Sequence, residues 1–548
     1  MLHYTLKGRS EGDIVDILFE NRGILNKDII LNPSAKSISN PFIYDNMEAG
    51  VKLLNKNINN KIVILVDSDT DGFSSAAEFY TGIKKINPEA KVTYIIHNDK
   101  SHGLTPDIMN KLMDLNPSLV IVPDAGSNDY EQHRILNQKD IKVLVVDHHN
   151  CEGFSQDAIV INNQLSKEGN KTLSGGGMVL KFFEAYDVLH GTEVAKEIID
   201  LAALAMIGDS MLMTEEETRY YCKTGMFAPQ NPFIRHLGGM ELSFKSVAWN
   251  ISPVINAVIR MGDVETKSLL FEALIGDIKP MEIEKRGKGL VKTNTLGYLD
   301  TMVSRYRSRQ RTQVNKIVEK GKVVDTKLCV IYFADEDFNK NLSGLVAGKL
   351  ATKYNKPALV LSKTEKLYAG SARVLHPFKM RSLMEEFSST DYATGHEAAF
   401  GIGFKHENME LFLQECNKYA VPKVAEYNVD KVYTGDVNSQ DIFRVLTYDK
   451  EWSKGFEQPI FAVELNNISI KNIDFYARNT VCIKTPSGLK MLKFNCSENE
   501  IFEMNSMETM NITAIVEFEI DKFGKPCVSI KDWSIENASE DGLDDWWF

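Results

Sequence analysis

Short apolar runs rich in Val and Ile mark the N-terminal half of the chain. Three of them span Ile62–Val66, Leu119–Val122 and Val143–Val146. Runs of this length and composition are typical of strands that are buried on both faces of a parallel sheet. Segments with helical spacing, Ser75–Ile86 and Thr105–Leu115, lie between these runs. The alternation predicts an α/β unit with a doubly wound parallel sheet.

An aspartate follows each of the three predicted strands within two residues: Asp67, Asp124 and Asp147. Ligands of doubly wound sheets bind beyond the carboxyl ends of the strands. We therefore expect three separate sequence motifs to meet in one cleft.

The segments that follow differ in character. From about Lys279 to Val323 the chain is polar and basic, which favours a long exposed helix joining two lobes; a plain solvated linker is the alternative. A second α/β unit is predicted from Lys327 to about Val421. The segment up to Ile535 alternates apolar and polar residues between turn signals, which favours a small β-barrel.

Composition narrows the class of protein. With 548 residues, 43% hydrophobic and 25% charged, the chain has ordinary globular composition and enough length for several cores. No run approaches the roughly 20 apolar residues of a membrane span, and the N-terminal residues lack a secretory signal pattern. Seven cysteines without a Cys-x-x-Cys pair indicate reduced thiols, so we expect a cytoplasmic protein. The net charge of −12 means that any nucleic-acid contact needs a local basic groove.

The first acidic motif is Asp67-Ser-Asp69-Thr-Asp71-Gly72, which places carboxylates at alternate positions. With Glu78 it also matches the spacing of an EF-hand calcium loop. An EF-hand requires a helix before the loop, however, and the residues before Asp67 are predicted to form a strand. The motif alone is compatible with calcium binding, a catalytic metal site or an acidic turn.

Two further motifs add ligand types that calcium does not prefer. Asp124-Ala-Gly126 follows the second strand, and Asp147-His148-His149 follows the third. Carboxylates combined with imidazoles suit manganese, iron or zinc better than calcium. Asp209 ends an apolar helical segment, where a buried unpaired carboxylate would be costly unless a metal compensated it.

These four motifs, in this order, resemble those of the DHH phosphoesterases, and in particular the RecJ branch. The resemblance implies two divalent ions, Mn²⁺ or else Mg²⁺, with Asp124 bridging them. The ligands that it implies are Asp69, Asp71, Asp124, His148 and Asp209. Many relatives carry a histidine where this chain has Leu65, and Asp67 could substitute as a ligand. His149 is expected to contact the scissile phosphate instead of a metal.

Later segments resemble the DHH-associated domain and its two substrate-binding motifs. Gly370-Ser371-Ala-Arg373 is the first motif and Thr394-Gly395-His396 is the second, with Thr394 in place of the usual glycine. The resemblance implies substrate binding by Gly370, Ser371, Arg373, Gly395 and His396. Arg373 offers a planar fork for a phosphate, whereas a surface ion pair is the structural alternative. Lys454–Phe461 resembles the entry to an OB-fold barrel of the RecJ type.

The resemblance divides the chain into six parts. In order, they are an N-terminal segment (1–55), a DHH catalytic domain (56–278), a connecting helix (279–325), a DHH-associated substrate-binding domain (326–425), an OB-like barrel (426–535) and an acidic tail (536–548).

The RecJ resemblance implies a monomeric exonuclease that degrades single-stranded DNA from 5′ to 3′ and releases mononucleotides, a chemistry of DNA repair, recombination and replication. Two ions can activate a water and hold the scissile phosphate, so the expected catalytic residues are Asp124, His148 and His149, without a protein nucleophile. Ser174–Gly177 is rich in glycine but lacks the Lys-Ser/Thr of a Walker motif, and a helix start is expected there.

Two other functions are compatible with the motifs. A DHH phosphodiesterase for short oligonucleotides or cyclic dinucleotides would need neither the barrel nor the basic connector. A replication-associated binding module with an inactive DHH site is the second alternative, although intact acids and both histidines argue against it. The acidic, aromatic end Asp541–Phe548 is either a solubilising tail or a peptide that docks a replication or repair protein.

Overall fold

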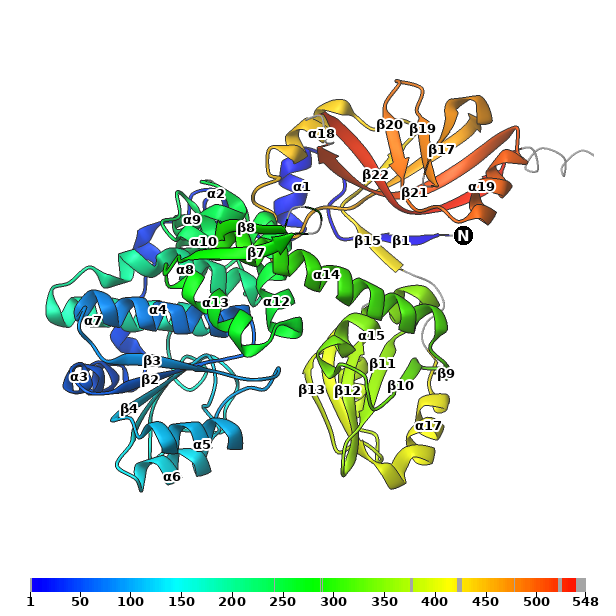
Figure 1. Cartoon of the computed structure of the whole chain (residues 1–548). Coiled ribbons are helices and arrows are strands. Elements are labelled where there is room, and N and C mark those ends of the chain that lie inside the picture. Colours follow the sequence, from blue (N-terminus) through cyan, green and yellow to red (C-terminus); the bar gives the residue numbers. More distant parts are fainter. Residues whose placement is uncertain are drawn as a thin grey trace, which may run out of the picture.

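The strands of the protein form three large sheets, which build a first lobe, a second lobe and a C-terminal unit (Figure 1). The computed structural model describes residues 2–538 apart from positions 241, 286, 288, 375–377, 421–425, 478 and 521–524, and it leaves out the side chains of His396 and Glu426. The tail Asp541–Phe548 lies outside the described residues. Within the described part, no helix has the length and apolar character needed to cross a membrane, and no disulfide joins the cysteines.

The first lobe contains a parallel five-stranded sheet in the order β3-β2-β4-β5-β6. Its strands are β2 (Ile62–Val66), β3 (Val92–Ile96), β4 (Leu119–Pro123), β5 (Lys142–Asp147) and β6 (Ile159–Asn162). The three predicted strands are confirmed. The chain passes from β2 outward to β3, then returns across β2 to β4 and continues the other way to β5 and β6, so the topological switch point lies between β2 and β4.

Helices cover both faces of this sheet, as a doubly wound fold requires. Alternate side chains of β2 enter different cores: Ile62 and Ile64 pack in the larger core, and Val63 and Leu65 in the smaller one. The larger core holds α3 (Met47–Asn57), α4 (Thr70–Ile86), α7 (Gly175–His190) and α8 (Val194–Gly208), and the smaller one α5 (Pro106–Leu115) and α6 (Tyr130–Asn137).

The EF-hand spacing has no structural counterpart. Helix α4 begins at Thr70, so only Asp67, Ser68 and Asp69 separate it from β2. Glu78, the twelfth position of that pattern, is fully buried inside the helix. This confirms that the calcium-loop match is coincidental.

More helices extend the first lobe: α9 (Glu216–Met226), α10 (Pro232–Gly238), α11 (Phe244–Ser246), a π-helical turn η3 (Val247–Ile251), α12 (Ser252–Met261) and α13 (Val264–Leu274). The predicted connecting helix over 279–325 is correct only in its second part. Helix α14 runs over Thr295–Lys320 and links the first lobe to the second (Figure 1).

The residues before α14 form a hairpin of β7 (Pro280–Lys285) and β8 (Gly289–Asn294). Apolar and polar residues alternate from Met281 to Glu284, and Gly287 and Gly289 adopt φ angles of 76° and 67°, which a tight turn favours. The polar and basic composition of the whole segment favours a helix, so this short alternating pattern did not lead to a predicted hairpin.

The second lobe has a mixed six-stranded sheet in the order β13-β14-β12-β11-β10-β9, in which only β10 and β11 are parallel. Its elements are β9 (Val323–Asp325), β10 (Val330–Ala334), α15 (Ser343–Tyr354), β11 (Ala358–Lys363), β12 (Leu367–Arg373), α16 (Met380–Glu385), β13 (Tyr392–His396), β14 (Ala399–Lys405) and α17 (Met409–Lys418). A second α/β unit at this place is confirmed.

The C-terminal unit is a seven-stranded mixed sheet in the order β16-β17-β21-β22-β20-β19-β18. Its elements are β16 (Lys431–Thr434), α18 (Ser439–Leu446), β17 (Phe461–Ser469), β18 (Ile473–Tyr476), β19 (Thr480–Lys484), β20 (Lys490–Lys493), α19 (Glu498–Asn505), β21 (Thr509–Ile520) and β22 (Pro526–Asn537). Among the described residues the strand pairings form an open row, because β16 and β18 do not pair. The expected barrel is therefore present as an open sheet.

The N-terminal residues complete the C-terminal unit. Strand β1 (His3–Leu6) pairs in parallel with β15 (Glu426–Val429), and α1 (Ile14–Glu20) packs into the core of the C-terminal sheet. The guanidinium of Arg22 donates to both carboxylate oxygens of Asp430 at 2.8 and 3.1 Å. Nothing in the local sequence pattern indicates this pairing of distant segments.

Arg219 fastens the first lobe to the C-terminal unit. It is fully buried on α9, lies over the Phe244 ring, and donates to Glu451 Oε2 at 2.7 Å and Ser453 Oγ at 3.0 Å. The same guanidinium reaches the carbonyl of Ile30 at 2.7 Å. A buried ion with several partners costs much more when one partner is lost than an exposed pair does.

Replacing this guanidinium should therefore destabilise the whole assembly of lobes. We expect Arg219→Met to lower the free energy of unfolding by about 3–5 kcal/mol in urea titrations, because Glu451 loses a buried partner. The matched control is Arg134→Met, which removes an exposed pair with Glu131 and should cost less than about 1 kcal/mol. Equal effects of the two substitutions would contradict this role of Arg219.

His133 introduces a pH dependence into the first lobe. It is fully buried on α6, neither ring nitrogen has a hydrogen-bond partner among the described residues, and burial lowers its pKa to about 4. Because the unfolded chain titrates near 6.5, protonation favours the unfolded state. Stability should be complete above about pH 6.5 and fall by about 3 kcal/mol as the pH drops toward 4.

We expect His133→Leu to remove this part of the acid sensitivity, measured as free energy of unfolding at pH 7.5 and pH 5. His190→Leu at an exposed position is the control and should keep the wild-type difference between the two pH values. If His133→Leu keeps the wild-type difference in the free energy of unfolding between pH 7.5 and pH 5, groups other than His133 account for the acid sensitivity.

Candidate metal centre

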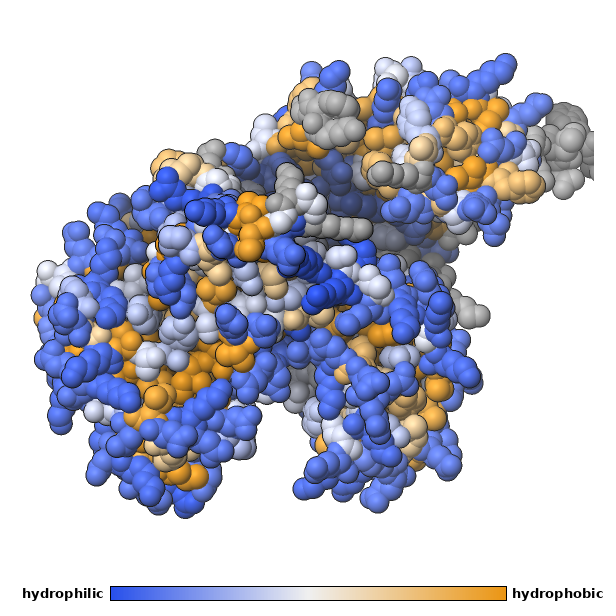
Figure 2. All heavy atoms as spheres, viewed as in Figure 1, coloured by the Kyte–Doolittle hydropathy of each residue, from blue (hydrophilic) through white to orange (hydrophobic). Residues whose placement is uncertain are grey.

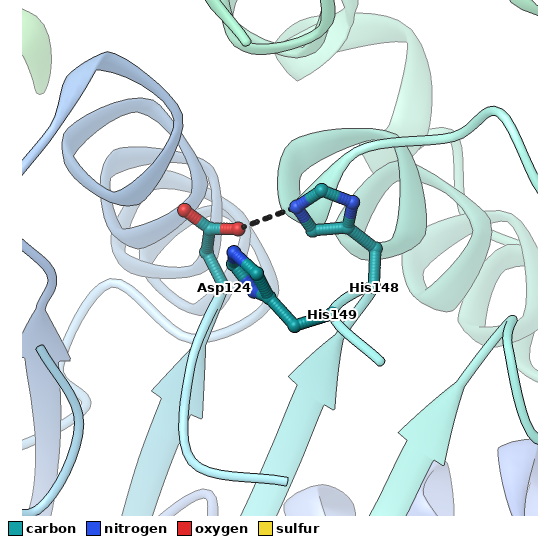
Figure 3. Close-up of side chains that lie close together, drawn as sticks. All are labelled: Asp124, His148 and His149. Carbon is teal, nitrogen blue, oxygen red and sulfur yellow. Dashed lines mark ion pairs between the residues drawn. The ribbon is translucent and has the colours of Figure 1, made fainter. Parts of the chain in front are cut away.

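The three strand-end motifs meet beyond the switch point of the first lobe. Asp67 follows β2, Asp124 follows β4, and His148 and His149 follow β5, while Asp209 caps the end of α8. Figure 3 shows Asp124 and the two histidines at the ends of neighbouring strands, with an ion pair joining Asp124 to His148. The predicted convergence of separate motifs is confirmed.

His148 lies at the centre of one ligand group. Its Nε2 atom is 3.3 Å from Asp124 Oδ1, 3.5 Å from Asp209 Oδ2 and 3.6 Å from Asp71 Oδ2. Both His148 Nε2 and Asp124 Oδ1 are buried without a hydrogen-bond partner in the described part of the chain. Buried polar atoms without partners are costly. The residues therefore fit a divalent ion, which would bind both atoms.

A second ligand group lies beside the first. One ligand atom from each of Asp67, Asp69 and His102 falls within 4.8 Å of the others. His102 Nδ1 contacts Asp67 Oδ2, and the amide of Gly103 donates to Asp67 Oδ1 at 3.1 Å. Asp69 uses Oδ1 to cap α4. Two adjacent groups can hold two ions.

His102 is a potential ligand that the motif analysis did not single out. It lies in the loop beyond the carboxyl end of β3, the strand next to β2. The strand-end pattern that selects the aspartates does not reach His102, because five residues separate it from the end of β3.

Asp71 anchors a helix as well as facing the centre. It accepts hydrogen bonds from Ser174 Oγ at 3.0 Å and from the amides of Gly175 and Gly176, both at 2.9 Å. A Cβ at Gly175 would lie 2.4 Å from Asp124 Oδ1. The glycine run is therefore the start of α7, as expected, and these glycines let the helix approach Asp124.

Burial and like charge dominate the electrostatics of the centre. Burial, together with Asp71, Asp69 and Asp67, raises the pKa of Asp124 well above its usual range. Burial, together with Asp71 and Asp69, raises the pKa of Asp209 to about 8. Burial lowers the pKa of His148, which keeps the imidazole neutral and its lone pair available to a metal. Crowded carboxylates and a neutral imidazole favour a bound cation.

Asp147 orients the histidine pair. It is buried and accepts hydrogen bonds from the amide of His148 at 2.7 Å and from His149 Nδ1 at 2.8 Å. The bond to Asp147 raises the pKa of His149 to about 9. Because Asp147 occupies Nδ1, the other nitrogen of the more exposed His149 is available to a substrate.

Ser371 and Arg373 line a cavity of about 360 Å³ between the two lobes. Figure 2 shows a hollow between these lobes and hydrophilic side chains over most of this face. Three further cations line the cavity, namely Lys100, Arg260 and Lys340. Burial and Arg260 lower the pKa of Lys100, whereas Asp69 opposes them, so the cavity lies within electrostatic range of the metal centre.

The other predicted substrate residues are placed differently. Gly370 lies on β12, where a Cβ would come within 1.8 Å of the Val360 carbonyl, so a glycine is required for strand packing. Gly395 lies on the edge strand β13 and does not line the cavity. The side chain of His396 lies outside the described part of the structure. Among the described residues no carboxylate forms an ion pair with Arg373, which argues against the surface-pair alternative.

Two family profiles match this chain. One is described as DHH family, N-terminal domain, and covers residues 61–206. The other is described as DHHA1 domain and covers residues 325–421. The first range holds the strand-end motifs up to α8, and the second holds Ser371 and Arg373.

Known proteins resemble the chain over most of its length. A Bacillus subtilis protein provisionally named as the SPbeta prophage-derived single-strand DNA-specific exonuclease YorK is 28% identical, covering 98% of both chains. The single-stranded-DNA-specific exonuclease RecJ of Haemophilus influenzae is 23% identical, over 82% of this chain and 83% of its own. The crystal structure of RecJ in complex with Mn²⁺ from Thermus thermophilus is similar to this chain with a TM-score of 0.73 and 17% identity, covering 95% of this chain and 76% of that one. The structure of the same protein in complex with Mg²⁺ has a TM-score of 0.69.

The ion-binding role of this centre can be measured without substrate. We expect Mn²⁺ to raise the melting temperature of chelator-treated protein, because binding to the folded state alone stabilises it. Asp124→Asn should remove most of this shift, while the ion-free variant should be at least as stable as the ion-free wild type, because one repelling buried carboxylate is gone. Asp114→Asn, at an exposed position on α5, should keep the full shift. A full Mn²⁺ shift in Asp124→Asn would exclude Asp124 as a ligand.

Proposed function

Because the chain is a RecJ-like member of the DHH superfamily, we propose that it is an exonuclease that hydrolyses single-stranded DNA from the 5′ end and releases mononucleotides. The main support is one arrangement: His148 Nε2 and Asp124 Oδ1, which are buried and have no hydrogen-bond partner among the described residues, lie near a cationic cavity that contains Arg373. A phosphodiester spanning the two would meet both metal ligands and phosphate-binding groups.

In this proposal Asp124 is shared by two ions, and Asp67, Asp69, Asp71, His148 and Asp209 complete their ligand shells. Imidazole among the ligands favours Mn²⁺ over Mg²⁺. When bound there, the two ions supply an activated water and neutralise charge on the phosphate.

The chain's own groups position the substrate. Arg373 offers two parallel donors to phosphate oxygens, Ser371 adds a hydroxyl donor, and Lys100 and Arg260 add positive charge. Asp147 holds the His149 ring so that its free nitrogen is directed to the substrate. In our proposal the cavity holds the 5′-terminal phosphate, which sets the direction of degradation.

The remaining parts serve a polymer substrate in this proposal. The C-terminal sheet acts as an OB-like surface for the strand, and residues 56–278, 326–425 and 426–535 act as the DHH, DHH-associated and strand-binding domains. The tail Asp541–Phe548 docks a replication or repair protein; its deletion would weaken a pull-down and leave nuclease activity intact.

The decisive test is digestion of a long single strand labelled at either end, with Mn²⁺ or Mg²⁺. We expect stepwise loss from the 5′ end, and Asp124→Ala and His148→Ala should reduce the rate at least about 10²-fold, beyond the usual effect of removing groups around a metal. Asp114→Ala is the control and should retain activity. Arg373→Ala should reduce the preference for a 5′-phosphate over a 5′-hydroxyl end, because the terminal phosphate loses its bidentate partner.

Other outcomes would select other functions. Cleavage of dinucleotides but not of a long strand would favour a small-substrate phosphodiesterase. Binding of the strand without any cleavage would favour a replication-associated binding module. Loss from the 3′ end would reverse the proposed polarity while keeping the hydrolytic chemistry.

A further inference from the structure

A groove of about 550 Å³ lies between the first lobe and the C-terminal unit. From the first lobe, Ile207, Ser210, Lys245 and Trp249 line it, and Lys454 is among the lining residues of the C-terminal unit. Ile207 and Ser210 lie on either side of Gly208 and Asp209 in the sequence, so the groove begins next to the metal centre. Whatever occupies the groove can therefore extend from a substrate held at the centre.

Trp249 is the main apolar feature of this groove. Its side chain is 73% exposed, whereas Trp452 and Trp533 are buried. Trp249 sits in the π-helical turn η3 between α11 and α12. A single π-helical turn inserts an extra residue into a helix and is frequent at functional sites. Unlike the other exposed aromatic rings among the described residues, the Trp249 ring lines this groove, where a ligand can cover its apolar face.

The walls of the groove are held in place by contacts between the lobes. The amide of Met213 donates to the Lys454 carbonyl at 2.9 Å, and a Cβ at Gly455 would lie 2.6 Å from the Leu212 side chain. Arg219 and Glu451 fix the same two segments to each other. A preformed site loses less entropy when it binds a ligand.

The charges of the groove favour a nucleic-acid strand near Trp249. Among the described residues no carboxylate pairs with Lys454, and Lys245 is 3.6 Å from Asp449 in an exposed pair. Three carboxylates also line the groove: Lys531 contacts Glu517 at 2.7 Å and Glu519 at 3.4 Å, and Glu457 accepts a hydrogen bond from the amide of Gly455 at 3.0 Å. An exposed indole beside two lysines is suited to stack a base and contact its phosphates.

We propose that Trp249 stacks a base of the single strand that leads away from the metal centre, with Lys245 and Lys454 against neighbouring phosphates. This inference rests on the proposed function, because it assigns the groove to the same substrate. It adds a binding position that a dinucleotide held at the metal centre does not fill, so the contribution of Trp249 grows with strand length.

The kinetic test compares a 20-nucleotide strand with a dinucleotide in the intact protein. Trp249→Ala should raise the ratio of the two KM values, long to short, about 5- to 150-fold, the range of one lost base-stacking contact. Trp249→Phe should restore most of the wild-type ratio, because it keeps an aromatic face. Phe227→Ala removes an equally exposed aromatic at the end of α9, outside both the groove and the cationic cavity, and should leave the ratio unchanged. The proposal would be overturned if Trp249→Ala left the ratio of KM values unchanged, or if Trp249→Phe did not bring that ratio back toward the wild-type value.

A binding test separates this inference from the proposed activity. Oligo(dT) strands are titrated into protein carrying Asp124→Ala, with and without Trp249→Ala, and both affinity and tryptophan fluorescence are measured. We expect quenching and tight binding only when Trp249 is present. If wild-type protein cleaves nothing and this difference persists, the nuclease proposal fails and the groove assignment stands. If oligo(dT) binds equally to both variants, the groove assignment fails and the nuclease proposal is untouched.

Discussion

The crowding of carboxylates at the carboxyl ends of β2 and β4 is the constraint on which the structure depends. Burial and mutual repulsion raise the pKa values of Asp124 and Asp209, so the folded chain holds these acids together at a cost. The surrounding elements offset that cost. Asp71 binds the start of α7, and Asp147 holds the two histidines. A divalent cation turns the same repulsion into attraction, which explains why the site suits a metal and little else.

Around this centre the three units enclose two hollows. The cationic cavity lies between the two α/β lobes, and the Trp249 groove lies between the first lobe and the C-terminal unit. The metal centre adjoins both. Long-range contacts fix this arrangement, since α14 joins the lobes and Arg219 bonds to Glu451.

Much of the first lobe is predictable from its sequence. Three strands of its sheet, β2, β4 and β5, and the helix that begins near Thr105 follow from local apolar patterns, because a strand buried on both faces must be apolar throughout. The edge strands β3 and β6 do not follow in this way; β3, for example, is only partly buried. The hairpin over 280–294 does not follow from the sequence, because its short alternating pattern lies within a longer polar and basic segment, most of whose arginines belong to the following helix α14. The open C-terminal sheet in place of a closed barrel was also not predictable, since strand alternation shows which residues face a core but not whether the edge strands pair.

By itself, the sequence determined the chemistry of the centre: Asp67, Asp124 and His148 lie directly after strands, and strand ends of a parallel sheet meet at one edge. Only the tertiary structure decided which other groups join them. His102 reaches Asp67, Lys100 and Arg260 join Arg373, and the N-terminal strand β1 pairs with β15. The physical reason is that apolar periodicity shows which residues of a segment are buried, whereas contacts between distant segments depend on how folded helices, strands and domains pack against one another.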